Sequence, residues 1–135
     1  MNGKVFFDTN VILYSYSEKT ERKNEIAQLH ILNYDGVIST QMMQEMCNIL
    51  IKKLKQDHLS VSKTLVELNS NFFVLVNDYD TIKKALEIHF KYRFSYYDSL
   101  IVASALQNEC AVLYSEDLQH KQKIENTLTI INPFL

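Results

Sequence analysis

Four separated acidic residues are the strongest candidates for chemistry in this sequence: Asp8, Glu45, Asp98 and Asp117. Each follows an apolar run typical of a strand or stands near the start of a segment with helical periodicity. Carboxylates that gather in one place repel each other unless they are protonated or bound to a cation. Because no cysteine or histidine cluster accompanies them, these oxygen ligands favour Mg²⁺ or Mn²⁺ over Zn²⁺. The four acids therefore predict a divalent-metal site of the kind used in phosphodiester or phosphoryl transfer.

Short apolar runs separated by helical segments must position these acids. The runs are KVFF (4–7), GVIS (36–39), NFFVLV (71–76), CAVLY (110–114) and, as a candidate fifth, LTII (128–131). We expect helices from about residue 11, over about 41–56, and from the caps Asp78 and Asp80 to about Tyr92. Continuous apolar strands alternating with helices are typical of a parallel sheet covered on both faces. The predicted fold class is α/β, with a central sheet of four to five strands, and its ligands bind beyond the carboxyl ends of the strands.

Helical periodicity places two of the acids. The expected helix over 41–56 follows a cap at Ser39 or Thr40, and its polar stripe consists of Gln41, Glu45, Asn48 and Lys52. Glu45 then lies near the helix start and faces away from the core. The segment FSYYDSLIVASAL (94–106) is apolar or small on almost every side, which indicates a central helix. If Ser95 caps that helix, Asp98 lies in its first turn, where the strands end.

Each acid also has a purely structural explanation. Asp98 fits the Ser-x-x-acid capping pattern, and taken alone it is best explained as a capping residue. Glu45 alone is most simply a solvated helix residue, and Glu116 with Asp117 fits a turn. Asp8 is harder to explain this way, because it directly follows a buried strand. The coincidence of four acids at one predicted edge of the sheet favours the metal site.

Composition and charge exclude several classes of protein. A chain of 135 residues with 47% hydrophobic content, two glycines and one proline suits a single domain over residues 1–135, without a flexible linker. Its two cysteines are too few for a disulfide framework and lack zinc spacing, so we expect a cytoplasmic protein. No apolar run approaches the roughly 18 residues of a membrane span, and no signal sequence is evident. If four acids hold cations, the net charge of −2 hides an excess of 14 basic residues over the remaining 12 acidic ones.

Several segments together resemble the PIN-domain proteins, most closely the bacterial VapC-type ribonuclease toxins: FFDTNVILY, STQMMQEM, FSYYDSLIVASAL, VLYSEDLQH and the final INPF. The resemblance covers essentially the whole chain. It implies a doubly wound α/β/α domain that cuts single-stranded or looped RNA with Mg²⁺ or Mn²⁺. It also implies that Asp8 and Asp98 are the central metal ligands, while Glu45 and Asp117 complete the acidic cluster directly or through water. The polar positions that support such a site are Asn10, Ser39, Ser115 and Glu116.

The resemblance further implies RNA as the substrate, a cognate antitoxin protein whose tail occupies the acidic cleft, and a homodimer. Among the lysines, Lys52 is the candidate for a phosphate contact because it shares a helix stripe with Glu45. Relatives often have glycine directly after the histidine of SEDLQH, where this chain has Lys121, so the shape of that loop stays open.

Two other functions remain open at this level. A phosphatase of the haloacid dehalogenase type also places an aspartate after its first strand, but it requires Asp-x-Asp where this chain has Asp8-Thr9-Asn10. In such a phosphatase the second aspartate protonates the leaving group, so its absence from this chain argues against that reaction. A catalytically silent RNA-binding or scaffolding PIN domain is the other alternative, and the four retained carboxylates argue against it.

Overall fold

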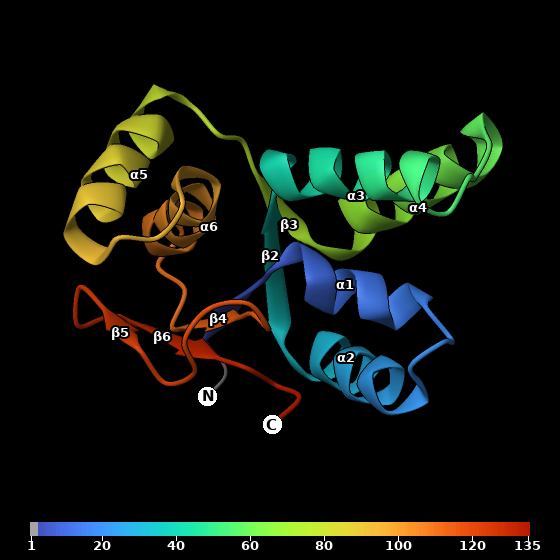
Figure 1. The fold of residues 1–135 in the computed structure, drawn as a ribbon, viewed down its shortest axis with the longest axis horizontal. Coiled ribbons are helices and arrows are strands. Elements are labelled where there is room, and N and C mark those ends of the chain that lie inside the picture. The colour runs from blue at the N-terminus through green and yellow to red at the C-terminus, as the bar shows by residue number, and fades with distance from the viewer. Residues whose placement is uncertain (1–2) are drawn as a thin grey trace.

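The structure, a computed structural model, describes residues 3–135, in which two helices follow each of the first three strands and three further strands end the described chain (Figure 1). The strands are β1 (Lys4–Phe7), β2 (Asp35–Ser39), β3 (Phe73–Leu75), β4 (Val112–Tyr114), β5 (Lys123–Ile124) and β6 (Leu128–Ile131). The helices are α1 (Thr9–Tyr16), α2 (Glu21–Asn33), α3 (Thr40–Lys52), α4 (His58–Asn71), α5 (Tyr79–Tyr92) and α6 (Tyr96–Gln107).

The sheet has six strands in the order β3-β2-β1-β4-β6-β5, and all neighbouring pairs are parallel except β5 and β6. The expected α/β class is therefore confirmed, but the expected count of four to five strands is wrong. The missed strand, β5, has only two residues, which is too short for a periodic pattern. It forms because Glu125 and Asn126 adopt positive φ angles of 51° and 59° in a tight turn that Thr127 N closes on Ile124 O at 3.1 Å. Without a glycine, this turn leaves little signal in the sequence.

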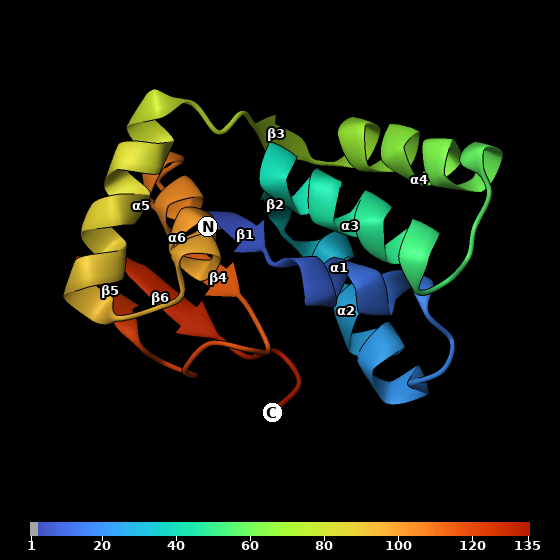
Figure 2. The same cartoon turned by 45° about the horizontal axis from the view of Figure 1, so that its top comes forward.

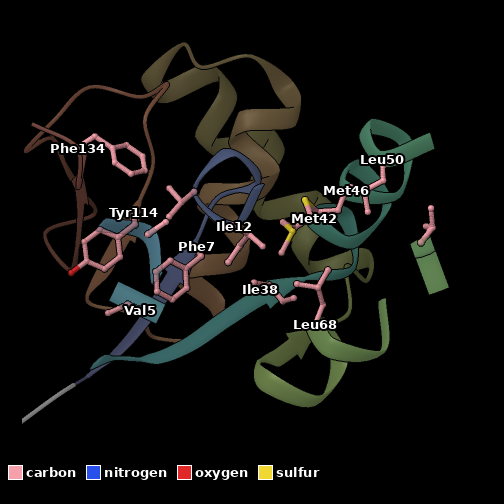
Figure 3. Close-up of a cluster of buried hydrophobic side chains, with 13 residues drawn as sticks. Val5, Phe7, Ile12, Ile38, Met42, Met46, Leu50, Leu68, Tyr114 and Phe134 are labelled. Atoms are coloured by element: carbon pink, nitrogen blue, oxygen red, sulfur yellow. The ribbon is translucent and has the colours of Figure 1, made fainter. Parts of the chain in front are cut away.

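Apolar side chains fill both faces of the sheet. In β1, Val5 and Phe7 belong to a core cluster shared with α1 to α4, whereas Phe6 points to the opposite face, into a cluster with α5 and α6. Figure 3 shows the first cluster, where Ile12 lies between Phe7 and Met42. Figure 2 shows α5 and α6 on one side of the sheet and α1 to α4 on the other. This is the three-layer arrangement expected for buried parallel strands.

A glycine in β2 allows the first core cluster to close. A Cβ atom added to Gly36 would lie 2.7 Å from Phe72 Cδ1 and 2.9 Å from Phe7 Cε2. Those two rings pack edge to face with centroids 5.9 Å apart. The strand can approach the aromatic pair only because residue 36 lacks a side chain.

Two helix boundaries differ from the expected ones, at the start of α1 and at the end of α3. A side-chain cap sets the first, and a residue with positive φ follows the second. The first helix begins at Thr9, earlier than expected, because Asp8 is its N-cap. The helix α3 ends at Lys52 rather than near residue 56, before a turn in which Lys55 has a φ of 54°. The cap of α5 is Asp78 alone. The helices α2 and α4 were not among the expected elements.

Within residues 3–135, no helix is both long and apolar enough to cross a bilayer. Cys47 and Cys110 are free thiols, and Cys110 is buried.

Candidate active site

The candidate site lies where the chain changes direction across the sheet. Strand β1 has β2 on one side and β4 on the other, so the connections that leave the carboxyl ends of these strands diverge here. Such switch points are the usual ligand sites of open α/β sheets. Asp8 follows β1, Ser39 ends β2, and Ser115 follows β4, so the three strand ends contribute polar residues to one edge.

Asp8 is buried, with only 7% of its surface exposed. Its two carboxylate oxygens have different partners: Thr9 N donates to Oδ1 at 2.7 Å, and Ser115 Oγ donates to Oδ2 at 2.9 Å. Burial raises the pKa of Asp8 to about 6; the two hydrogen bonds oppose that rise, and the negative charges of Glu45 and Asp98 add to it. Asp8 is therefore a desolvated carboxylate close to two other carboxylates.

Glu45 is held from both sides. Thr9 Oγ1 donates a short hydrogen bond to Glu45 Oε1, and Gln41 Nε2 donates to Glu45 Oε2 at 3.1 Å. Gln41 Nε2 also donates to the backbone oxygen of Tyr97 at 3.1 Å, which ties α3 to the start of α6. As expected, Ser39 caps α3, since its Oγ accepts from Met42 N at 3.3 Å.

Asp98 lies in the first turn of α6, as expected. Ser95 Oγ caps the helix by accepting from Asp98 N at 3.1 Å. The cap therefore uses the hydroxyl of Ser95 and the backbone of Asp98. Among residues 3–135, the Asp98 carboxylate itself makes no hydrogen bond or ion pair with another side chain.

Asp117 faces the first helix. Asn10 Nδ2 donates to Asp117 Oδ2 at 2.7 Å, and Asp117 N donates to Ser115 Oγ at 3.3 Å. Its neighbour Glu116 does not join the acidic cluster, because its carboxylate pairs with Lys23.

A cavity of about 290 Å³ connects these groups, and its walls are Thr9, Asn10, Glu45, Asn48, Ile49, Asp98 and Asp117. Three of the four predicted acids thus line one space, with Asp8 buried beside it. Lys52 is exposed at the end of α3 and is not part of the wall.

The donor chemistry of the cavity fits a hard divalent cation. All four acids offer oxygen only, and within the described residues none of them pairs with a basic side chain. Neutral donors orient the oxygens of Asp8, Glu45 and Asp117 without compensating their charge. However, no three Asp, Glu, His or Cys side chains in residues 3–135 are grouped closely enough to share one ion. The site therefore fits Mg²⁺ or Mn²⁺ by donor type and charge, and a three-carboxylate ligand set requires these side chains to move.

Three residues that orient the site were not predicted to do so. Thr9 and Gln41 hold Glu45, and their only sequence signal is position: one lies between Asp8 and Asn10, the other on the stripe of Glu45. Asn77 accepts from Gln41 N at 3.0 Å and donates to Ser104 Oγ at 3.0 Å, so it joins α3 to α6. Nothing in the local sequence indicates this bridge.

Comparison with known proteins places this geometry among related folds. The model of the family described as PIN domain matches residues 5–125. No curated protein sequence matches the chain.

Three solved structures are similar over most of their length. A toxin–antitoxin complex from Klebsiella pneumoniae is 19% identical with a TM-score of 0.71, covering 96% of this chain and 97% of that one. The sarcin–ricin loop cleaving toxin VapC20 of Mycobacterium tuberculosis is 16% identical with a TM-score of 0.69, covering 84% and 89%. A DNA-bound VapBC from Salmonella typhimurium is 20% identical with a TM-score of 0.64, covering 96% and 97%. At these identities the likeness is one of fold.

Proposed function

Because the chain belongs to the PIN domain family, we propose that it is a divalent-metal-dependent endoribonuclease that hydrolyses RNA phosphodiester bonds. The observation that carries this proposal is the convergence of Glu45, Asp98 and Asp117 on one cavity beside buried Asp8, without a basic partner among the described residues. Such a concentration of negative charge repels a phosphodiester unless cations neutralise it, so activity depends on a divalent ion.

Asp8 and Asp98 are the central ligands in this proposal, and Glu45 and Asp117 complete the set directly or through water. A Mg²⁺ or Mn²⁺ ion held by these residues would supply positive charge to the phosphate oxygens and would lower the pKa of a bound water molecule. The chain supplies orientation: Ser115 fixes one oxygen of Asp8, and Thr9 and Gln41 fix the two oxygens of Glu45. Buried or hydrogen-bonded ligands of this kind lose less conformational freedom when an ion binds.

The substrate in this proposal is single-stranded or looped RNA. Unpaired nucleotides expose their backbone to a shallow acidic cavity more readily than a duplex does. The similar toxin from M. tuberculosis cleaves the sarcin–ricin loop, which supports a loop as one substrate to test.

The proposal is tested with purified protein, a single-stranded RNA, an RNA hairpin and p-nitrophenyl phosphate. We expect cleavage of RNA with Mg²⁺ or Mn²⁺, none with EDTA, and no hydrolysis of the phosphomonoester. Asp98→Asn should abolish cleavage, because the amide carries no charge for the ion. Asp80→Asn is the matched control, since Asp80 occupies the first turn of α5 as Asp98 does in α6.

The other outcomes distinguish the alternatives. Hydrolysis of the phosphomonoester without RNA cleavage would indicate a phosphatase. RNA binding without cleavage under any divalent ion would indicate a catalytically silent PIN domain.

We further propose that the nuclease is the cytoplasmic toxin of a toxin–antitoxin pair. Similar folds have been solved as a toxin–antitoxin complex and as a VapBC assembly, which supports a protein partner. Expression of the chain alone should arrest growth, and co-expression of the neighbouring reading frame should restore it. If the chain alone leaves growth unaffected while RNA cleavage persists in vitro, the toxin assignment fails and the nuclease assignment stands.

A homodimer is the third part of the proposal. The face of α5 turned away from α6 exposes four large apolar side chains, Tyr79, Ile82, Leu86 and Phe90. Exposed apolar stripes of this kind are typical of protein contacts. Light scattering should give twice the chain mass, and Leu86→Glu should give a folded monomer with a lower melting temperature, because association stabilises the folded chain.

A further inference from the structure

Three consecutive residues after β4 are bound to α1 and its N-cap Asp8, each through a different side chain. Ser115 Oγ donates to Asp8 Oδ2 at 2.9 Å, Tyr14 Oη donates to Glu116 Oε1 at 2.8 Å, and Asn10 Nδ2 donates to Asp117 Oδ2 at 2.7 Å. Asn10 and Tyr14 are four residues apart on α1, so they present their side chains from the same face of the helix. The loop that carries Asp117 is thus attached to α1 at two positions about one turn apart.

The middle attachment is the most elaborate. Lys23 of α2 forms a short ion pair with Glu116 Oε2, and its Nζ lies 3.4 Å from Tyr14 Oη. The same Nζ lies 4.8 Å from the ring centroid of Tyr14 and 5.5 Å from that of Phe134. The two rings pack edge to face with centroids 5.2 Å apart, and Phe134 is buried. We call Tyr14, Lys23, Glu116 and Phe134 the Lys23 cluster.

Several ties hold the cluster in a single arrangement. Arg22 Nη2 donates to the backbone oxygen of Phe134 at 2.6 Å, which fixes the C-terminal segment to α2. The side chains of Lys23 and Glu116 are 27% and 22% exposed, so water screens their pair only in part. The cluster therefore gives Glu116 one position, and the peptide that joins Glu116 to Asp117 is positioned with it.

A second Lys–Tyr–Glu contact provides a comparison, although there the glutamate, Glu125, also has Lys84 Nζ at 3.4 Å from its Oε1. Lys91 Nζ and Tyr92 Oη donate to Glu125 Oε2 at 2.7 and 2.8 Å, and Lys91 Nζ lies 5.3 Å from the Tyr92 ring centroid. This cluster joins α5 to the turn after β5, on the opposite side of the molecule from α1 and α2 (Figure 1). None of the four acids of the candidate site is among its members. It is thus a built-in control for the loss of a Lys–Tyr–Glu contact as such.

We infer that Lys23 is a positioning residue: through Glu116 it sets the place of the Asp117 carboxylate and thereby the affinity of the site for a divalent cation. The inference rests on the proposed function and adds residues that lie outside the cavity. Partners that orient metal ligands typically change metal affinity by about tenfold to a hundredfold when they are removed.

The direction in which Lys23→Met changes the affinity for a divalent cation distinguishes a positioning role of Lys23 from a simple effect of its charge. Lys23→Met removes a positive charge near an acidic site, and by Coulomb's law alone the variant would bind a divalent cation more tightly. If Lys23 acts through position, the same variant releases Glu116 and binds the cation more weakly. The two explanations predict changes in opposite directions.

The experiment is isothermal titration with Mn²⁺, without RNA, on the full chain at a temperature at which every variant is folded. Lys23→Met should weaken Mn²⁺ binding by about tenfold, and Lys23→Arg should retain the wild-type affinity because it keeps the ion pair. Tyr14→Phe, which leaves the charge unchanged, should weaken binding in the same direction by a smaller factor. Lys91→Met and the double variant Lys84→Met/Lys91→Met, which removes both lysines from Glu125, are the controls and should leave the affinity unchanged.

A second comparison tests whether the effect passes through Glu116. The double variant Lys23→Met/Glu116→Gln should bind Mn²⁺ as Glu116→Gln alone does. Unchanged or tighter binding by Lys23→Met, or equal weakening by Lys91→Met, would overturn the inference.

The inference and the proposed function can fail separately. If the wild-type protein binds no Mn²⁺, the metal-dependent function is wrong, and the amide resonance of Asp117 then decides the structural step. That resonance should shift in Lys23→Met and stay in place in Lys91→Met. An unshifted Asp117 amide in Lys23→Met would show that Lys23 does not position it.

Discussion

At the scale of single residues, the burial of Asp8 has a consequence for stability. Its pKa is raised from 3.8 to about 6, mainly by burial. A carboxyl whose pKa is higher in the folded state contributes stability below the unfolded pKa and loses it as the pH rises through the folded pKa. Asp8 should therefore lower stability progressively between about pH 4 and pH 6, by about 3 kcal/mol in total.

Asp8→Asn should remove this loss and be more stable than the wild type at pH 7 in EDTA. Asparagine keeps an oxygen for Thr9 N, and its amide can donate to the hydroxyl of Ser115. Urea unfolding at pH 4.5 and pH 7 measures the difference. The control is Asp57→Asn, at an exposed cap whose pKa is lowered by the hydrogen bond from Ser60 N. Because Asp57 is already ionised at both pH values, the difference between Asp57→Asn and the wild type should stay nearly constant between pH 4.5 and pH 7. Equal pH dependence of Asp8→Asn and wild type would contradict the role of Asp8.

The backbone at Lys121 determines the shape of the loop after His120, which the sequence left open. It has a φ of 69°, so the loop keeps the left-handed backbone that glycine adopts freely. Lys121→Gly should therefore stabilise the protein by about 0.5–1 kcal/mol and raise the melting temperature by a few degrees, since Lys121 N still donates to Ile130 O. Lys123→Gly, in strand β5, should destabilise it instead. A lower melting temperature for Lys121→Gly would indicate that the side chain outweighs the backbone strain.

At the scale of elements, the first turn of α6 allows helix capping to be tested separately from the proposed catalytic role of Asp98. Ser95→Ala removes the hydroxyl that accepts from Asp98 N and should cost about 1 kcal/mol of stability while leaving metal-dependent cleavage largely intact. Asp98→Asn keeps that backbone hydrogen bond and should retain the fold while losing cleavage. Melting temperatures with and without Mg²⁺ and cleavage rates of both variants test this. If Asp98→Asn cuts at the wild-type rate, Asp98 is only a helix-start residue.

At the scale of the whole molecule, the net charge of −2 combines 16 acidic residues, four of them in the proposed metal site, with 14 basic residues. Lys52 lies exposed on α3 two turns beyond Glu45, near enough along the helix to meet a phosphate of a bound RNA. Lys52→Ala should weaken RNA binding and reduce the salt slope by about one phosphate contact. Lys63→Ala, at an exposed position of α4, is the control. A salt slope identical to that of the wild type would make Lys52 an ordinary solvated residue.

The sequence by itself determined the features that depend on neighbours within about four residues. Ser95 caps α6 as expected, and the run LTII forms β6 with the expected bounds. The caps of α3 and α5, Ser39 and Asp78, are each one of the two residues that the sequence indicated. Such caps and apolar runs are local, so the pattern of residue types suffices to find them. The α/β class follows from their order along the chain.

Only the tertiary structure decided which side chains meet. Thr9 and Glu45 are 36 residues apart, and Asn10 and Asp117 are 107 apart, so packing of whole elements sets these contacts. Glu116 and Asp117 are neighbours in the chain, yet one pairs with Lys23 and the other lines the cavity. Local pattern cannot separate two adjacent acids, because their roles depend on which charges the packed helices α1 and α2 bring to each of them.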